Sequence, residues 1–100
     1  MRNFRTLDLA VAFYRLSHAL RLESHLKEQL NRAAASIALN LAEGRGRASV
    51  ADQKRFFTMA HASLRECQAI LTLGQCQNTA AWKTLDALAA HLYRLIKSMG

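Results

Sequence analysis

The sequence predicts an all-α protein, an antiparallel up-down-up-down four-helix bundle. Three observations favour this fold: proline is absent, only 4 Gly occur in 100 residues, and apolar residues recur at spacings of three and four. An all-β domain needs many tight turns, which are built largely from Pro and Gly. Short polar breaks separate the helical segments, so consecutive helices are expected to be antiparallel neighbours in a single domain spanning residues 1–100.

The first two predicted helices occupy the N-terminal half. The first runs from about Arg5 to Leu22 and has an apolar stripe at spacings of 4, 3 and 4. This stripe consists of Leu9, Phe13, Leu16 and Leu20. The second runs from about His25 to Glu43, and Ser24 is the expected N-cap because its hydroxyl can accept a hydrogen bond from the first turn. Gly44 is the expected end, since glycine commonly follows a last helical turn.

The last two predicted helices occupy the C-terminal half. The third opens at Ser49 as its N-cap and reaches Gly74. The fourth is capped by Asn78 or Thr79 and continues to about Ser98. Its apolar stripe consists of Trp82, Leu85, Ala89, Leu92, Ile96 and Met99. This is the cleanest heptad pattern in the chain.

The net charge and the cysteine content limit the cellular environments in which this protein is expected. Lys and Arg number 14 against 7 Asp and Glu, a net charge of +7. No apolar run reaches the roughly 18 residues of a membrane span, so no membrane partner is expected. Asp8 interrupts the apolar N-terminal stretch, which is therefore expected to be helix rather than signal peptide. Cys67 and Cys76 are expected to be reduced thiols in a cytoplasmic protein, with Cys76 the more exposed.

The titratable residues do not form the patterns of a catalytic or metal site. The four histidines are His18, His25, His61 and His91, and none of them pair at i,i+3 or i,i+4. No Glu-x-x-His motif occurs, whereas a di-iron bundle needs two such motifs with extra glutamates. The sequence therefore predicts no enzymatic activity, no cofactor and no metal.

A basic stretch follows the second predicted helix. Arg45, Arg47, Lys54 and Arg55 fall within eleven residues, where Asp52 is the only acid. The third helix begins in this stretch, so its free backbone N–H groups add to the positive potential. Arginines beside glycines and a helix N-terminus suit a nucleic-acid phosphate backbone, and these four residues are the candidate contacts. The alternative is a solvated loop with ordinary charges.

Apolar residues exceed the needs of a bundle core. A core consumes about three positions in seven, yet the first and fourth predicted helices leave only narrow polar strips. Alanines at positions 12, 19, 87 and 90 interrupt even these strips. The surplus favours self-association through a second buried face, although scattered surface Ala and Leu are the alternative.

Specific sequence segments resemble a known bacterial family. Residues 29–44 read QLNRAAASIALNLAEG and are followed by RGR, while residues 55–57 read RFF and residues 63–66 read SLRE. Together these segments resemble a four-helix-bundle family whose members include proteins encoded in intervening sequences of large-subunit ribosomal RNA genes. The accessory variability determinant of diversity-generating retroelements is a relative. The similarity covers about Phe4 to Leu73, and Asn40 to Gly44 is its most specific part.

The resemblance implies a ring-like homo-oligomer, a pentamer by the family's pattern, with no enzymatic activity. It implies that the partner is RNA, DNA or a nucleic-acid-handling protein. Asn40, Glu43 and Gly44 match the family motif, whose implied role is a polar cap and turn where the second helix ends. The family often has proline where this chain has Ala38, so a straighter second helix is expected. The leading hypothesis is a homo-oligomer that binds RNA or DNA backbone, and the alternative is a protein–protein scaffold with no nucleic-acid role.

Overall fold

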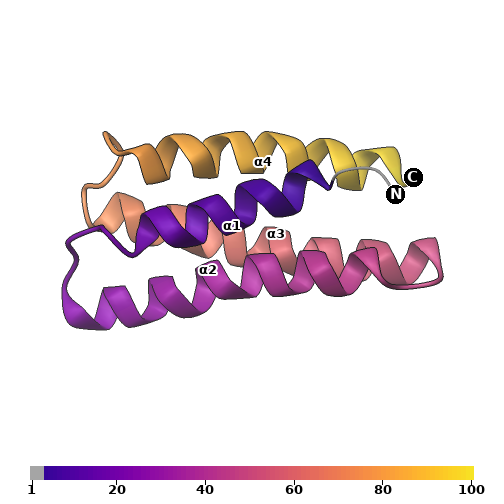
Figure 1. Cartoon of the computed structure of the whole chain (residues 1–100), viewed down its shortest axis with the longest axis horizontal. Coiled ribbons are helices and arrows are strands. Elements are labelled where there is room, and N and C mark those ends of the chain that lie inside the picture. The colour runs from indigo at the N-terminus through magenta and orange to yellow at the C-terminus, as the bar shows by residue number, and fades with distance from the viewer. Residues whose placement is uncertain (1–3) are drawn as a thin grey trace.

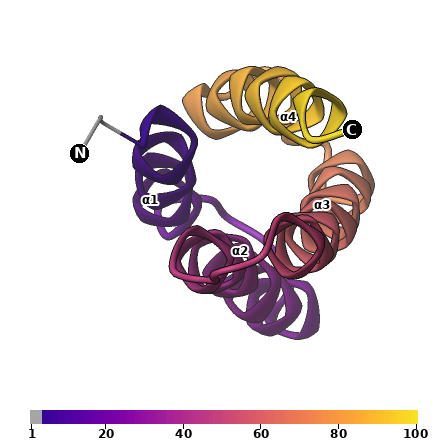
Figure 2. The same ribbon diagram turned by 90° about the vertical axis from the view of Figure 1, so that its right-hand side faces the viewer.

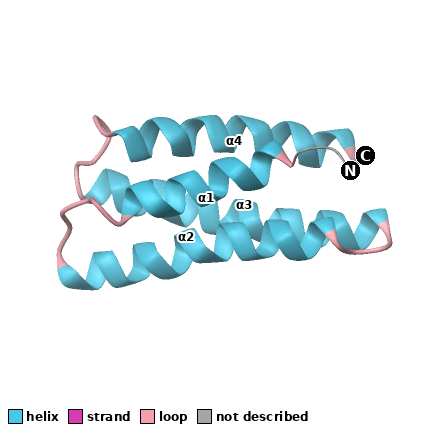
Figure 3. Cartoon of the chain, in the orientation of Figure 1, coloured by secondary structure: helices cyan, strands magenta, loops and turns pink. Residues whose placement is uncertain are grey.

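The architecture is an up-down-up-down bundle, as predicted. The computed structural model describes residues 4–100, and its helices are α1 (Arg5–Ser17), α2 (Ser24–Arg45), α3 (Val50–Leu73) and α4 (Ala80–Ser98). Successive helices run in opposite directions (Figure 1), and short loops join them (Figure 3). Viewed along the bundle, α1 lies between α2 and α4 and diagonally across from α3 (Figure 2). Within residues 4–100, no helix is both long and apolar enough to cross a membrane.

The core lies along the axis enclosed by the helices. Every helix contributes fully buried side chains, the largest of which are Phe13, Leu30, Ile37, Leu41, Leu64, Leu71, Leu85, Leu88 and Leu92. Burial of each such side chain stabilises the fold by roughly 1.5–3 kcal/mol. The most extensive helix pairing joins α2 and α3, where Ala33, Ala34 and Ala60 are fully buried. Small side chains at these positions let the two backbones approach closely.

Helix α1 ends at Ser17, five residues before the predicted end at Leu22. Its last backbone bonds tighten to the i→i−3 pattern, and Leu20 N donates to Ser17 O at 3.2 Å. Its buried face also differs from the predicted leucine stripe, because Ala10, Phe13 and Ser17 face the core. The predicted leucines are only partly buried at the edge of that face.

The two ends of α2 differ from the sequence predictions. Ser24 is the first helical residue instead of the N-cap, and Glu23 occupies the cap position without a side-chain hydrogen bond. The helix also continues past Gly44 to Arg45, with Gly46 as its C-cap. A Cβ atom built on Gly44 would lie 2.7 Å from Cε1 of Phe57. Gly44 is therefore required for close packing of α3 rather than for a turn.

The caps of α3 and α4 confirm the sequence predictions. Ser49 Oγ accepts a hydrogen bond from the Asp52 backbone N–H at 3.0 Å. Thr79, not Asn78, caps α4, because its Oγ1 accepts from the Trp82 backbone N–H at 3.2 Å. Such caps satisfy N–H groups that have no partner within the helix, which contributes about 1 kcal/mol each.

The turn after α3 explains why Cys76 is buried, although it is still the more exposed of the two cysteines, as predicted. Gln75 adopts a left-handed conformation with φ of 57°, and Cys76 N donates to Leu71 O at 2.8 Å. Together with the bond from Gln75 N to Thr72 O, this forms a Schellman motif that folds the chain back over the helix end. Cys76 consequently joins the core with 6% exposure.

Cys67 lies deeper in the same core, on α3, and is fully buried. Burial raises the pKa of the Cys67 thiol from 9.0 to about 12, with a smaller contribution from the Glu66 carboxylate. A thiol that stays protonated at neutral pH is a poor nucleophile and a poor metal ligand. Cys67 therefore acts as a small apolar residue of the core.

Candidate nucleic-acid interface

The four predicted contact residues gather at one end of the bundle. Arg45 ends α2, Arg47 lies in the following loop, and Lys54 and Arg55 lie in the first two turns of α3. The loop can be this short because Ser49 caps α3 immediately, and Gln53 Nε2 donates to the Arg47 carbonyl at 2.9 Å. The same end of the bundle carries the start of α1 and the end of α4 (Figure 1).

Aromatic rings support the three arginines of this cluster. The guanidinium carbon of Arg47 lies 4.7 Å from the centroid of the Phe56 ring, and that of Arg55 lies 4.4 Å from the same centroid. Arg45 lies over Phe4 at 5.1 Å. Cation–π contacts of this kind contribute about 0.5–1 kcal/mol at exposed sites and orient the guanidinium groups. The arginines are thus held at the surface by the rings beneath them.

Carboxylates neutralise part of the cluster. Arg47 pairs with Glu43 at 2.7 Å and approaches Asp52 at 3.9 Å, while Arg55 lies 3.3 Å from Asp52. The sequence prediction included Asp52 but not Glu43. The signal for Glu43 was its i,i+4 spacing from Arg47, which spans the end of α2. Four cations and two carboxylates leave a net charge of +2. Among the described residues, Lys54 makes no ion pair.

Asn40 and Gly44 have environments different from the cap and turn that the resemblance implies. Asn40 Nδ2 donates to the Ser36 carbonyl oxygen at 2.9 Å and to Ser36 Oγ at 3.1 Å. Ser36 Oγ in turn lies 2.8 Å from Ser63 Oγ of α3. Asn40 therefore belongs to a polar seam between α2 and α3, while Gly44 provides a close helix approach. Helix α2 is unbroken at Ala38, consistent with the absence of proline there.

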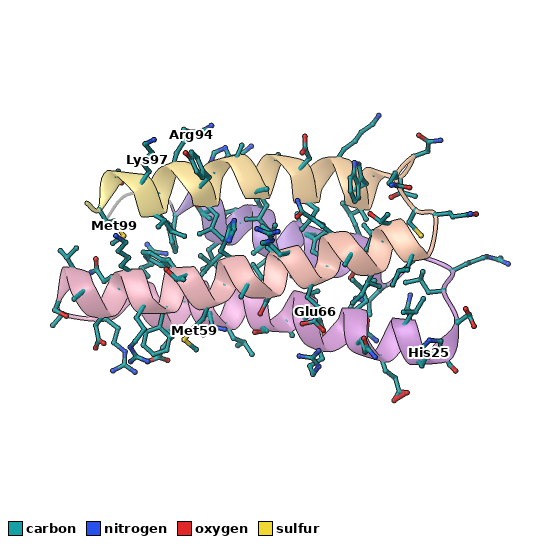
Figure 4. All side chains as sticks on the ribbon, turned by 180° about the vertical axis from the view of Figure 1, so that it is seen from behind. His25, Met59, Glu66, Arg94, Lys97 and Met99 are labelled. Carbon is teal, nitrogen blue, oxygen red and sulfur yellow. The ribbon has the colours of Figure 1, made fainter. Side chains whose placement is uncertain are left out.

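The polar α2–α3 seam continues toward the middle of the bundle. Arg32 of α2 forms an ion pair with Glu66 of α3. Figure 4 shows Glu66 and Met59 on the α2 side of α3, whereas Arg94 and Lys97 project outward from α4. Because both partners of the ion pair are exposed, it contributes at most about 1 kcal/mol.

Two apolar grooves lie along two other helix pairs, one between α1 and α2 and one between α3 and α4. The groove between α1 and α2 has a volume of about 270 Å³ and is lined by Val11, Tyr14, Ala35, Ala38 and Leu39. Leu39 is 69% exposed at its edge, so the apolar surplus predicted from the sequence includes this face. The groove between α3 and α4 has a volume of about 360 Å³ and is lined by Thr58, His61, Tyr93, Ile96 and Lys97.

Sequence reasoning missed the α3–α4 groove. The sequence does contain a signal for this groove, namely a polar stripe on α3 that lies beside the core positions and has spacings of 4, 3 and 4. The stripe consists of Lys54, Thr58, His61 and Arg65. Within residues 4–100, no three His, Cys, Asp or Glu side chains converge in a way that could hold a metal ion.

Comparison with known proteins supplies a family context for this geometry. The family model described as 23S rRNA-intervening sequence protein matches residues 5–100. This match confirms the resemblance and extends it over α4, where the sequence offered only a pattern. A search of curated proteins gives no match to the chain.

Proposed function

The chain belongs to the family of 23S rRNA-intervening sequence proteins, and from this premise we propose that it is a non-catalytic homo-oligomer that binds RNA or DNA through the phosphate backbone. The observation that carries the proposal is the gathering of Arg45, Arg47, Lys54 and Arg55 at one end of the bundle. Guanidinium groups held over aromatic rings present their N–H donors in fixed positions, which suits phosphate oxygens.

Electrostatics supports this choice of partner. The chain carries a net charge of +7, and the cluster keeps a net charge of +2 despite its carboxylates. Contacts of this type neutralise phosphates and release counterions, so affinity falls steeply as salt concentration rises. They position a nucleic acid without reading its sequence.

Self-association is part of the same proposal. The apolar groove between α1 and α2 offers a surface that a second copy of the chain could cover, and the family resemblance implies a ring, with five copies as the expected number. A ring repeats the basic cluster once per subunit. Several weak phosphate contacts on one particle then raise the overall affinity for a nucleic acid, although each single contact is no stronger.

The test measures the affinity for a structured RNA and for a duplex DNA as salt concentration is raised. Replacing Arg45, Arg47, Lys54 and Arg55 by Ala should weaken binding and reduce the log–log salt slope by about two to four. The matched control is a triple variant with Arg15→Ala, Arg21→Ala and Lys83→Ala, whose exposed side chains lie toward the other end of the bundle. For each charge removed, this control should reduce the log–log salt slope less than the quadruple variant does.

Two results would contradict the proposal at different levels. Weak binding even at low salt would exclude backbone binding, and attention would turn to a protein partner of the apolar grooves. An unchanged slope in the quadruple variant would exclude this cluster as the site, although binding elsewhere on the surface would remain. Measurement of the particle mass in solution tests the oligomer separately.

A further inference from the structure

We infer that the groove between α3 and α4 binds an unpaired nucleotide of a single nucleic-acid strand, with Tyr93 as the platform on which its base stacks. The groove has a volume of about 360 Å³ and combines an aromatic ring, an aliphatic wall and one cationic group, the ammonium of Lys97. This inference rests on the proposed nucleic-acid binding and adds a second subsite to it. The loop cluster contacts phosphates of any strand, whereas this groove selects strands with unstacked bases.

Tyr93 is the first part of the argument. Its side chain is 58% exposed, unlike the rings of Phe13 and Phe57, which are buried in the core. Base–aromatic stacking accepts any base, because every base has a π face. Lys97 Nζ lies 5.6 Å from the centroid of the Tyr93 ring and 3.4 Å from its hydroxyl oxygen. The ammonium group therefore lies over the ring, close enough to contact the phosphate of a nucleotide whose base stacks on the platform.

The facing side of the groove is formed by Thr58 and His61, which belong to a polar stripe on α3 with a cation at each end. Lys54, Thr58, His61 and Arg65 follow one another at spacings of 4, 3 and 4 and therefore share one helix face. Neither Lys54 nor Arg65 forms an ion pair within the described part of the chain. The stripe spans about 16 Å along the helix axis, enough to contact more than one phosphate.

Carboxylates are remote from this groove. None of the residues that line it carries a carboxylate. Glu66 is turned to the α2 side of α3, where it pairs with Arg32 (Figure 4). Asp86 lies seven residues before Tyr93 on α4, which is about 10 Å along the helix axis. The groove is thus less neutralised than the loop cluster, which contains Glu43 and Asp52.

Lys54 connects the two subsites. It belongs to the basic loop cluster, and it is also the first residue of the stripe that leads along the groove. A strand whose phosphates contact the cluster can continue along this stripe and place a base on Tyr93. Bases in a duplex are already stacked and paired, so a duplex can use only the phosphate contacts.

The test compares Tyr93→Ala with the wild-type protein on oligouridine, oligothymidine and an RNA duplex, each of about ten nucleotides or base pairs. Binding is followed by fluorescence anisotropy at one fixed salt concentration. Tyr93→Ala should weaken single-strand binding at least about five-fold while changing duplex binding less than two-fold. Tyr93→Phe keeps the ring and should bind like the wild type. Leu73→Ala removes another exposed apolar side chain, 71% exposed at the other end of α3, and is the matched control.

A second readout places the base directly. Ultraviolet crosslinking to oligouridine, followed by tryptic digestion, should attach a nucleotide to the peptide of residues 84–94, which contains Tyr93. Loss of affinity for either single strand supports the inference, and the strand that is affected more is the one that the groove prefers.

Several outcomes would overturn the inference. Equal losses on single strands and duplex, or no loss in Tyr93→Ala, would remove the stacking platform and leave the loop cluster in place. A smaller particle mass for Tyr93→Ala would assign the groove to a neighbouring copy of the chain. Failure of the wild-type protein to bind any of the three probes would remove both this inference and the proposed function.

Discussion

Lys27 Nζ lies 2.6 Å from the backbone carbonyl oxygen of Leu20, a contact between the first turn of α2 and the loop that precedes it. The same ammonium group donates to the carbonyl oxygens of His18 at 2.8 Å and Ser17 at 3.2 Å. One lysine therefore donates to three carbonyl groups at and just beyond the end of α1, of which that of Ser17 also accepts from Leu20 N. A cation at this position also interacts favourably with the negative end of the α1 dipole.

Replacement of this ammonium group should destabilise the fold. We expect Lys27→Met to lower the free energy of unfolding by about 1–3 kcal/mol, because it removes hydrogen bonds from a charged donor while keeping the aliphatic stem. Urea denaturation at neutral pH measures the change. Lys83→Met on the exposed side of α4 is the control and should stay within about 0.5 kcal/mol of the wild type. Equal stability of the two variants would show that water replaces the Lys27 contacts.

Two glycines near the basic cluster should respond differently to substitution. Gly44→Ala places a Cβ atom 2.7 Å from Cε1 of Phe57, a buried ring, and should destabilise the protein by about 1–3 kcal/mol. Gly46→Ala meets nothing closer than the Glu43 carbonyl oxygen at 3.7 Å, and its φ of −85° suits alanine. It should therefore change stability by less than about 0.5 kcal/mol. Thermal unfolding of both variants checks the pair, and similar melting temperatures would contradict the close approach at Gly44.

Stability should decline in alkaline solution because of Cys67. In the unfolded chain the Cys67 thiol has a pKa of 9.0, whereas in the folded chain burial raises that pKa to about 12. Between these values the unfolded state binds fewer protons, so the free energy of unfolding falls as pH rises. The slope approaches about 1.4 kcal/mol per pH unit for this group. Because other groups also titrate there, the measurement compares urea unfolding of the wild type and Cys67→Ala between pH 9 and 11. Parallel pH profiles would exclude the contribution of Cys67.

Glu43 should weaken nucleic-acid binding in the wild-type protein. Its carboxylate lies 2.7 Å from the Arg47 guanidinium, and Glu43→Gln would release that cation for phosphate. We expect about a two- to five-fold gain in duplex affinity at low salt, the scale of one exposed ion pair. Glu28→Gln makes the same change of charge at the other end of α2. An equal gain in both variants would show that net charge, not the cluster, sets the affinity.

Helix number, order and direction were predictable from the sequence because they depend on local rules. Apolar periodicity identified each helix. Ser49 was recognised as a cap, and Thr79 was one of two candidates, because a cap hydroxyl bonds to an N–H group only three residues away. The basic cluster was also predictable, since Arg45 to Arg55 are close along the chain and the helix start between them keeps them at one end.

The predictions that failed did so for different physical reasons, some of them local and some tertiary. Gly44 has the local signature of a helix stop, but α2 continues to Arg45, and the missing side chain at Gly44 instead leaves space for Phe57 of α3. Ser24 lost its predicted cap role because α2 begins one residue earlier than expected. Cys76 is the more exposed cysteine, as predicted, but a Schellman turn folds it back toward the end of α3, so it is also buried.

The sequence by itself determined an all-α bundle, its net charge of +7, its basic α2–α3 connection and its family resemblance. Only the tertiary structure decided that Arg32 pairs with Glu66, because these two residues lie 34 positions apart in the sequence and meet only where α2 packs against α3. It also decided that Tyr93 stays exposed beside His61 and Lys97, because that groove exists only where α3 and α4 pack together. Periodicity specifies which face of each helix is apolar, whereas the angle and depth at which two helices meet depend on side chains from both.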